Sequence, residues 1–227
     1  MDLSTIKPDT KKALFLLKRQ LPEFVCDAVN LEGINYTLPE VQTLLDGITV
    51  GGHKLSDETI TLNQAKTWKF LIESIESSKF SLQKDFACEC HNIAAKEEAL
   101  SWGVFRTGGV TIAGTDYLPP DANSLDSLWK TMIEQSKNIE NIYECAIFIF
   151  LTMARTQFFY DVNERMGRFM MNGLLLSNGF PAINLPSKKQ LEFNQLMLDF
   201  YNSNNIVPMT NFMMSCLSPQ AVKIMSE

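Results

Sequence analysis

A long apolar segment, from Ile139 to Thr156, limits the choice of folds for this chain more than any other part of it. From Cys145 onward the segment is apolar nearly all round. A helix without a polar face is buried on all sides, because it presents no surface suited to water. The most apolar part, Cys145 to Ala154, is too short to span a bilayer. The segment therefore predicts a helix at the centre of a bundle, and no membrane association.

A polar and aromatic elbow separates this segment from a second one with helical character, from about Glu164 to Ser177. Asn163 is suited to cap the second helix at its N-terminus. Gly179 is suited to the first position beyond its C-terminus, and Pro181 prevents continuation. The sequence therefore predicts two core helices joined by a short elbow.

Capping signals and apolar spacing predict further helices. Asp9-Thr10 can cap a helix from Lys11 to about Leu21, and Thr37-Leu-Pro-Glu40 has the spacing of a capping box. The other predicted helices cover 60–75, 82–94, a stretch from about 124, 190–201 and one or two turns after 208. The chain is thus expected to be mainly α-helical.

One segment has a different pattern. Gly103 to Gly114 alternates apolar and polar residues around a Gly108-Gly109 turn signal. This alternation is typical of a short β-hairpin. Tyr117-Leu-Pro-Pro120 ends it.

The composition excludes some classes of function. The chain has 227 residues, and its net charge of −6 argues against a nucleic-acid-binding surface. Its five cysteines are scattered, and Cys88-x-Cys90 lacks the second pair that a zinc site needs. Reduced thiols and an N-terminus without an apolar signal core predict a cytoplasmic protein.

The elbow has the residues of an anion site. A helix N-terminus offers free N–H groups and the positive end of the helix dipole. Arg165 and Arg168 are three positions apart, so both guanidinium groups leave one face of the first turn and are suited to phosphate oxygens. Asp161 is suited to a Mg²⁺ ion that bridges those phosphates. On spacing alone, an ordinary helix start with an acid, a cap and two arginines is the simpler interpretation.

The segment Gln157 to Arg168 resembles the Fic-family motif H-x-F-x-D/E-G-N-G-R-x-x-R, with five positions in register: Phe159, Asp161, Asn163, Arg165 and Arg168. The segment 103–118 resembles the family's flap. The resemblance implies a Fic-type helical bundle with a small β-hairpin flap that transfers AMP from ATP to a protein hydroxyl. It also implies that Asp161 holds Mg²⁺ and that Asn163 and the two arginines bind the nucleotide. A protein target would dock along the flap edge, at residues Val110, Thr111 and Ile112.

A third similarity concerns regulation. Ala28-Val-Asn-Leu-Glu32-Gly33 resembles the family's inhibitory motif S/T-x-x-x-E-G/N, with Ala28 in place of the hydroxyl residue. The resemblance implies that Glu32 pairs with Arg168 and blocks the γ-phosphate position. The alternative is an exposed glutamate at a helix end. We expect an N-terminal helical region over 1–60 with the inhibitory helix near 24–33, a core over 61–205 with the motif at 157–168, and a C-terminal extension over 206–227.

Three residues depart from the family motif. Gln157 replaces the histidine that acts as general base, and losing a positioned base typically costs roughly 10²- to 10⁴-fold in rate. Glu164 replaces a glycine and would repel a phosphate. Val162 replaces the other glycine, and a positive φ there would be strained. His91 is the best candidate for a substitute base, although a lone histidine in an apolar helix is more often a packing residue.

Two functions follow, beside the alternative of a toxin–antitoxin style of regulation in which a Fic fold is held inactive by a small partner or by Glu32. The first is a Fic-like nucleotidyltransferase with a degraded active site whose activity is weak or absent. The second is an inactive Fic-fold protein that acts by binding a nucleotide or a protein. The sequence leaves open whether the chain is an enzyme. The resemblance further implies a homodimer.

Overall fold

A computed structural model describes residues 3–227, and within this range the chain forms helices and no β-strand. Three short 3₁₀ segments lie at Leu3–Thr5, Ala122–Ser124 and Ser187–Lys189. The α-helices are, in chain order, α1 (Thr10–Leu31), α2 (Leu38–Leu45), α3 (Leu55–Glu76), α4 (Lys84–Ala94), α5 (Leu125–Ser136), α6 (Ile142–Thr156), α7 (Asn163–Ser177), α8 (Gln190–Ser203), α9 (Val207–Ser215) and α10 (Pro219–Ser226).

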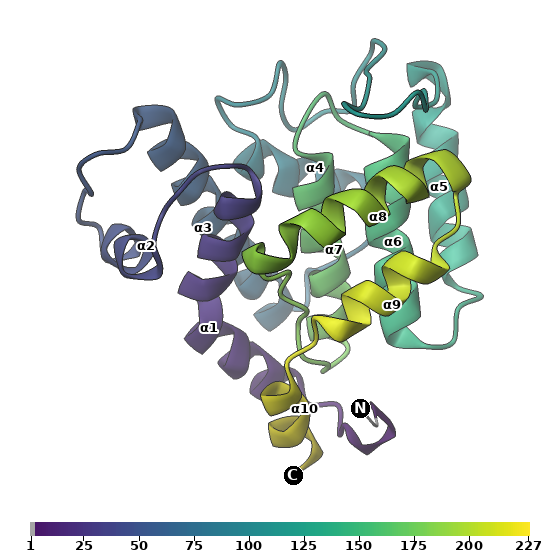
Figure 1. The fold of residues 1–227 in the computed structure, drawn as a ribbon. Coiled ribbons are helices and arrows are strands. Elements are labelled where there is room, and N and C mark those ends of the chain that lie inside the picture. Colours follow the sequence, from purple (N-terminus) through teal and green to yellow (C-terminus); the bar gives the residue numbers. More distant parts are fainter. Residues whose placement is uncertain (1–2) are drawn as a thin grey trace.

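Helices α6 and α7 form the centre of the bundle, as the sequence predicts. They pack most extensively against each other, and α7 also contacts α1, α3 and α4. Figure 1 shows the pair in the middle, with α1, α2 and α3 on one side and α8 crossing the front. A Cβ atom added to Gly167 of α7 would lie 2.8 Å from the carbonyl oxygen of Phe150 in α6, so the two helices meet at a glycine. This close pairing fixes the elbow between them.

The prediction that the first helix ends near Leu21 was wrong, because α1 continues through Pro22 to Leu31. Proline removes one hydrogen bond from a helix interior. Apolar residues on both sides of Pro22 are buried on one face and keep the helix in place; they are Leu14, Leu17, Phe24, Val25 and Val29. The longer helix brings Glu32, at its C-terminus, to the elbow.

The expected β-hairpin over 103–118 was also wrong, because this part of the described chain contains no strand. The backbone N–H of Arg106 donates to the carbonyl of Phe158 in the elbow (3.0 Å). The Arg106 side chain donates to the carbonyls of Gly108 (2.7 Å) and Pro120 (2.5 Å). The buried guanidinium of Arg106 thus binds one carbonyl within this segment and one just after it, and the flap is an irregular loop tied to the elbow.

The two ends of the chain lie side by side, as Figure 1 shows. The backbone N–H of Lys7 donates to the carbonyl of Met225 at 2.9 Å. Helix α1 packs on α3 and α7, while α9 packs on α6. The division into regions 1–60, 61–205 and 206–227 stays a prediction. None of the helices in residues 3–227 combines the length and the apolar character that membrane crossing requires.

Candidate functional site

The elbow is held by two residues in the left-handed conformation. Gln157 ends α6 with φ 53°, and Val162 precedes α7 with φ 65°. Between them, Phe158 and Phe159 are fully buried and plug the core below the elbow. A β-branched residue is a genuine outlier at positive φ, and a left-handed L-residue costs roughly 1–2 kcal/mol. The strain predicted for Val162 is therefore present in the fold.

Asn163 connects the two sides of the elbow instead of capping α7. Its Oδ1 accepts a hydrogen bond from the Phe159 N–H (2.9 Å), and its Nδ2 donates to the Phe159 carbonyl (2.9 Å) and to Gln157 Oε1 (2.9 Å). The helix begins at Asn163 itself, so the expectation that Asn163 is the N-cap was wrong. No side chain caps α7. The first N–H groups of the helix lack a capping side chain, which is the condition for an anion site at a helix N-terminus.

The Gln157 side chain connects the end of α6 to the start of α7. Its Nε2 donates to the Ala154 carbonyl (2.7 Å), while its Oε1 accepts from Asn163 (2.9 Å). Both ends of the amide are therefore satisfied within the protein. An amide is no usable base near neutral pH, and this one is fixed in place as well.

His91 is a packing residue. The Gly103 N–H donates to its Nδ1 (3.1 Å), so Nε2 carries the proton and donates to the Asp161 carbonyl (3.3 Å). The ring is fully buried and stacks on Phe159. Burial lowers the pKa of His91 from 6.5 to about 4, against the opposing effect of the Asp161 carbonyl. With both ring nitrogens engaged, His91 does not meet the geometry required of a substitute base.

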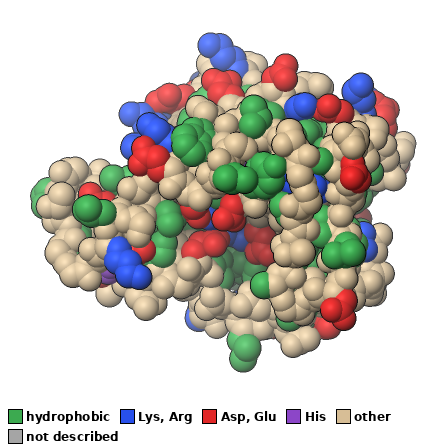
Figure 2. Space-filling model, turned by 90° about the horizontal axis from the view of Figure 1, so that it is seen from above, with side chains coloured by type: hydrophobic (Ala, Val, Ile, Leu, Met, Phe, Trp, Pro, Cys, Tyr) green, Lys and Arg blue, Asp and Glu red, His purple; other side chains and the backbone are tan. Residues whose placement is uncertain are grey.

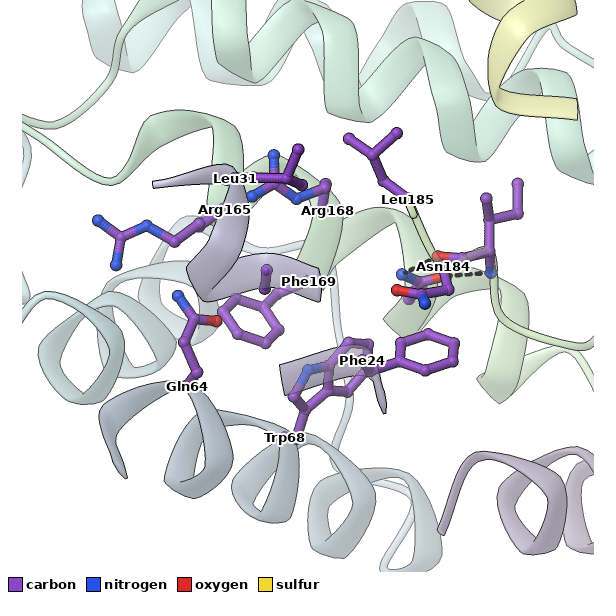
Figure 3. A pocket seen from close by; sticks show the side chains of 12 residues that line it. Phe24, Leu31, Gln64, Trp68, Arg165, Arg168, Phe169, Asn184 and Leu185 are labelled. Carbon is purple, nitrogen blue, oxygen red and sulfur yellow. Dashed lines mark hydrogen bonds between the residues drawn. The ribbon is translucent and has the colours of Figure 1, made fainter. Parts of the chain in front are cut away.

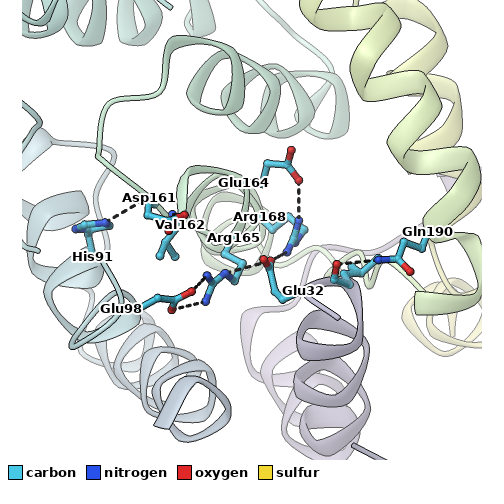
Figure 4. A network of polar contacts seen from close by, with 10 residues as sticks. Glu32, His91, Glu98, Asp161, Val162, Glu164, Arg165, Arg168 and Gln190 are labelled. Atoms are coloured by element: carbon cyan, nitrogen blue, oxygen red, sulfur yellow. Dashed lines mark hydrogen bonds and ion pairs between the residues drawn. The ribbon is translucent and has the colours of Figure 1, made fainter. Parts of the chain in front are cut away.

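The two motif arginines lie together beneath Glu32 (Figure 4). Glu32 Oε1 is 3.1 Å from Arg165 Nε and 3.6 Å from Arg168 Nη2. The contact of Glu32 with Arg168, which the resemblance implied, is therefore present, and Glu32 contacts Arg165 even more closely. The arginine side chains are 3% and 10% exposed, against 33% for Glu32, so Glu32 covers the arginines from the solvent side.

Two further carboxylates complete the network. Glu98, in the turn after α4, faces both terminal nitrogens of Arg165: Oε2 lies 2.9 Å from Nη1, and Oε1 contacts Nη2. Glu164 Oε2 is 3.8 Å from Arg168 Nη1, and Glu164 Oε1 accepts a hydrogen bond from the Tyr201 hydroxyl (2.7 Å). Burial raises the pKa of Glu164, against the effects of Arg168 and Tyr201. Two guanidinium groups thus face three carboxyl groups.

A cavity of about 280 Å³ opens over this network. Figure 2 shows acidic side chains gathered around a hollow near the middle of this face. The cavity is lined by Glu32, Thr111, Ile112, Ala113, Gln157, Asp161, Val162, Asn163, Glu164, Arg165 and Tyr201. The structure thus brings the elbow and two residues of the predicted flap edge to one cavity; Val110 is not among the lining residues.

Asp161 is exposed at this cavity, and its Oδ1 accepts a hydrogen bond from the Val162 N–H (2.7 Å). Within residues 3–227, no three His, Cys, Asp or Glu side chains are grouped as a metal site. One carboxylate fits Mg²⁺ only where phosphate oxygens supply further ligands. The arginine N–H groups that would hold those phosphates face carboxylates. The residues present therefore fit a Mg²⁺–nucleotide complex only after Glu32 has moved.

A second, much smaller cavity lies on the inner side of the arginines (Figure 3). Its volume is about 20 Å³, and Phe24, Trp68, Phe169 and Leu185 form much of its apolar wall. Such a volume has room for a water-sized group only. A nucleotide phosphate must therefore approach the arginines from the outer cavity, where the carboxylates lie.

The sequence gives no sign of Glu98 or Tyr201 as site residues, and it places Arg106 in the flap segment without predicting its role. Arg106 is buried and donates to the Gln157 carbonyl (2.5 Å) as well as to the flap, so it holds flap and elbow together. Glu98 lies in a charged stretch that is typical of a solvated surface. Tyr201 lies on the apolar face of a predicted helix, where an aromatic residue is ordinary core.

No protein-family model matches the chain. It is 22% identical over 200 residues to the protein adenylyltransferase Fic of Drosophila mojavensis, an alignment that covers 86% of this chain and 39% of that protein. Fic of Drosophila grimshawi gives the same identity, with 86% and 41% covered. The chain thus spans about two fifths of the length of these curated relatives.

Solved structures show the same fold. A Fic-domain-containing signalling protein from Bacteroides thetaiotaomicron superimposes with a TM-score of 0.76 at 20% identity and covers 99% of this chain and 91% of its own. Fic-1 from C. elegans gives a TM-score of 0.78 at 18% identity, with 92% of this chain and 63% of that chain covered. The chain has the Fic fold, and its sequence similarity to Fic adenylyltransferases supports its assignment to the Fic family.

Proposed function

We propose that this chain is a Fic-type nucleotidyltransferase domain in a closed state, with weak or absent transfer of AMP from ATP to a protein hydroxyl. The observation that carries the proposal is the position of Glu32 over Arg165 and Arg168 at the start of α7. These arginines are the groups that would hold the nucleotide phosphates, with Asn163 at the start of the same helix and Asp161 as the ligand of Mg²⁺. Bound Mg²⁺ would supply positive charge at the phosphates. The fixed amide of Gln157 supports weak transfer, because it provides no base.

The first test is isothermal titration of the purified chain with ATP and Mg²⁺, beside Arg168→Ala and Glu32→Gly. Removing Glu32 takes away the carboxylate that contacts both arginines, so we expect tighter binding in Glu32→Gly and none in Arg168→Ala. Radiolabelled ATP then tests whether AMP is transferred to any protein. Equal heats for Glu32→Gly with and without Arg168→Ala would contradict the proposed phosphate site.

The second candidate is a protein that binds a nucleotide or a protein without catalysis, and the hydrogen bonds of the Gln157 amide favour it. Both ends of the amide bond to Ala154 and Asn163, so the residue in the histidine position supports the elbow. Under this proposal, ATP would bind in Glu32→Gly without any labelling, even when Gln157→His is added. Labelling in that double variant would exclude the binding-only function.

We also propose a protein target that docks along the flap edge at 110–112, and a homodimer in the cytoplasm. Thr111 is exposed and Ile112 half-buried at the mouth of the cavity, which supports docking beside the elbow. An Ile112→Glu variant with intact ATP binding should lose target labelling or capture. Analytical ultracentrifugation that shows only monomer would exclude the dimer.

A further inference from the structure

The guanidinium group of Arg165 has all three nitrogens facing carboxylates. Its Nε lies 3.1 Å from Glu32. Its Nη1 and Nη2 form a fork with the two oxygens of Glu98. The side chain is 3% exposed. This paired geometry is also the one with which arginine binds phosphate, so a phosphate and Glu98 compete for the same fork.

Glu32 and Glu98 differ in how firmly they are held. Glu32 is 33% exposed and contacts Arg165 through one nitrogen. Glu98 is 17% exposed and contacts it through two. Paired, less exposed contacts are less screened by water and salt than single exposed ones. The fork of Arg165 therefore stays occupied when Glu32 leaves.

The charge balance around the two arginines also indicates that Glu98 limits phosphate binding. With Glu32 removed, Arg165 and Arg168 still face Glu98 and Glu164, so an entering phosphate meets no excess of positive charge. Releasing Glu98 would both open the fork and add the positive charge of Arg165. Arg168 is less closely paired than Arg165, because its Nη2 makes no hydrogen bond and its Nη1 is 3.8 Å from Glu164, so Arg165 is the arginine whose charge depends on a tightly held carboxylate.

We propose that Glu98, a residue outside the motif, sets the affinity of this site for polyphosphates by occupying the fork of Arg165, independently of Glu32. The inference rests on the proposed function, since it concerns the same phosphate site. Glu98 would then determine how strongly polyphosphate binding depends on Mg²⁺. With Glu98 in place, the site needs Mg²⁺ to neutralise a triphosphate. When Glu98 is removed, this dependence on Mg²⁺ becomes weaker.

The test is titration of the full chain with inorganic tripolyphosphate, with and without Mg²⁺. The variants are Glu98→Gln, Glu32→Gly and the double variant, with Glu97→Gln as control. Glu97 is the neighbouring glutamate, with a side chain 65% exposed and no contact to the arginines. Glu98→Gln should bind at least about tenfold more tightly in both the wild-type and the Glu32→Gly background, and its affinity should depend less on Mg²⁺. Glu97→Gln should change neither.

Circular dichroism confirms folding, and Glu98→Asp provides a second variant that shortens the side chain but keeps its charge. It should lie between the wild type and Glu98→Gln. Unchanged or weaker binding in Glu98→Gln would overturn the proposal and make Glu98 a support for Arg165. ATP binding in Glu32→Gly that Arg168→Ala abolishes, with no gain in tripolyphosphate affinity from Glu98→Gln, would leave the proposed function standing and reject the role of Glu98. Tighter tripolyphosphate binding in Glu98→Gln, with no ATP binding in any variant, would support the role of Glu98 and reject the proposed function.

Discussion

The buried His91 makes the stability of this fold depend on pH in a window that can be stated in advance. Its pKa is about 4 in the folded protein and 6.5 as a free side chain. Below about pH 6.5 the unfolded chain therefore binds a proton that the folded chain does not. Stability is complete above this value and is lost as the pH falls toward about 4. The difference between 6.5 and about 4, at about 1.36 kcal/mol for each pH unit, corresponds to about 3 kcal/mol.

The measurement is the free energy of unfolding in urea, followed by circular dichroism from about pH 7.5 to about pH 4.5. His91→Asn keeps an acceptor for the Gly103 N–H but removes the titrating ring. The variant will be less stable at neutral pH, because it loses the bond to the Asp161 carbonyl and the stacking on Phe159. Its loss of stability on acidification should be smaller than that of the wild type by about 2–3 kcal/mol.

His53→Gln is the matched control, since it removes the other histidine of the chain and leaves the buried one in place. It should keep the pH dependence of the wild type. Equal pH dependence in His91→Asn and the wild type would refute the reasoning. So would an NMR titration of the His91 ring near its ordinary pKa, and such a result would also make His91 a base candidate again.

Three substitutions test the packing of the elbow, each by urea unfolding. Arg106→Met leaves the partly buried carbonyls of Gly108, Pro120 and Gln157 without this donor and should cost more than about 1 kcal/mol; a smaller loss would contradict the role of Arg106 in holding flap and elbow together. Gly167→Ala sets a methyl group against the backbone of α6 and should cost at least about 1–3 kcal/mol; no loss would disprove the close approach. Val162→Gly should cost less than about 2 kcal/mol, because relief of left-handed strain offsets part of the lost burial; a larger loss would mean that the strain is small.

The helices were predictable from the sequence because their signals are local. The capping box of Thr37 and Glu40 forms as expected, and Gly179 has the positive φ (80°) of a residue just beyond a helix end. The predictions were wrong where contacts between residues far apart in the sequence determine the local structure. Pro22 lies inside α1 because the apolar stripe continues past it, and the flap is a loop whose Arg106 binds the carbonyls of Gly108 and, beyond the flap, Pro120.

The site could be predicted only in part, for a similar reason. Arg165 and Arg168 belong to one short motif, and the motif alone brings them together. Their partners come from far along the chain: Glu98 is 67 residues from Arg165, and Tyr201 is 37 residues from Glu164. No spacing rule relates such residues, so the neutralisation of the arginines became visible only in the fold.

Two features of the elbow would oppose nucleotide transfer: Gln157 provides no base, and carboxylates balance the charges of Arg165 and Arg168. Loss of the base costs roughly 10²- to 10⁴-fold, or about 3–5 kcal/mol of barrier. A carboxylate about 4 Å from a phosphate charge costs about 4 kcal/mol at an intermediate effective dielectric. The two effects are of similar size, so neither Gln157→His nor Glu32→Gly alone should give strong labelling with ATP. The two changes together should give labelling well above either one, and strong labelling with Gln157→His alone would show that Glu32 is no obstacle to the nucleotide.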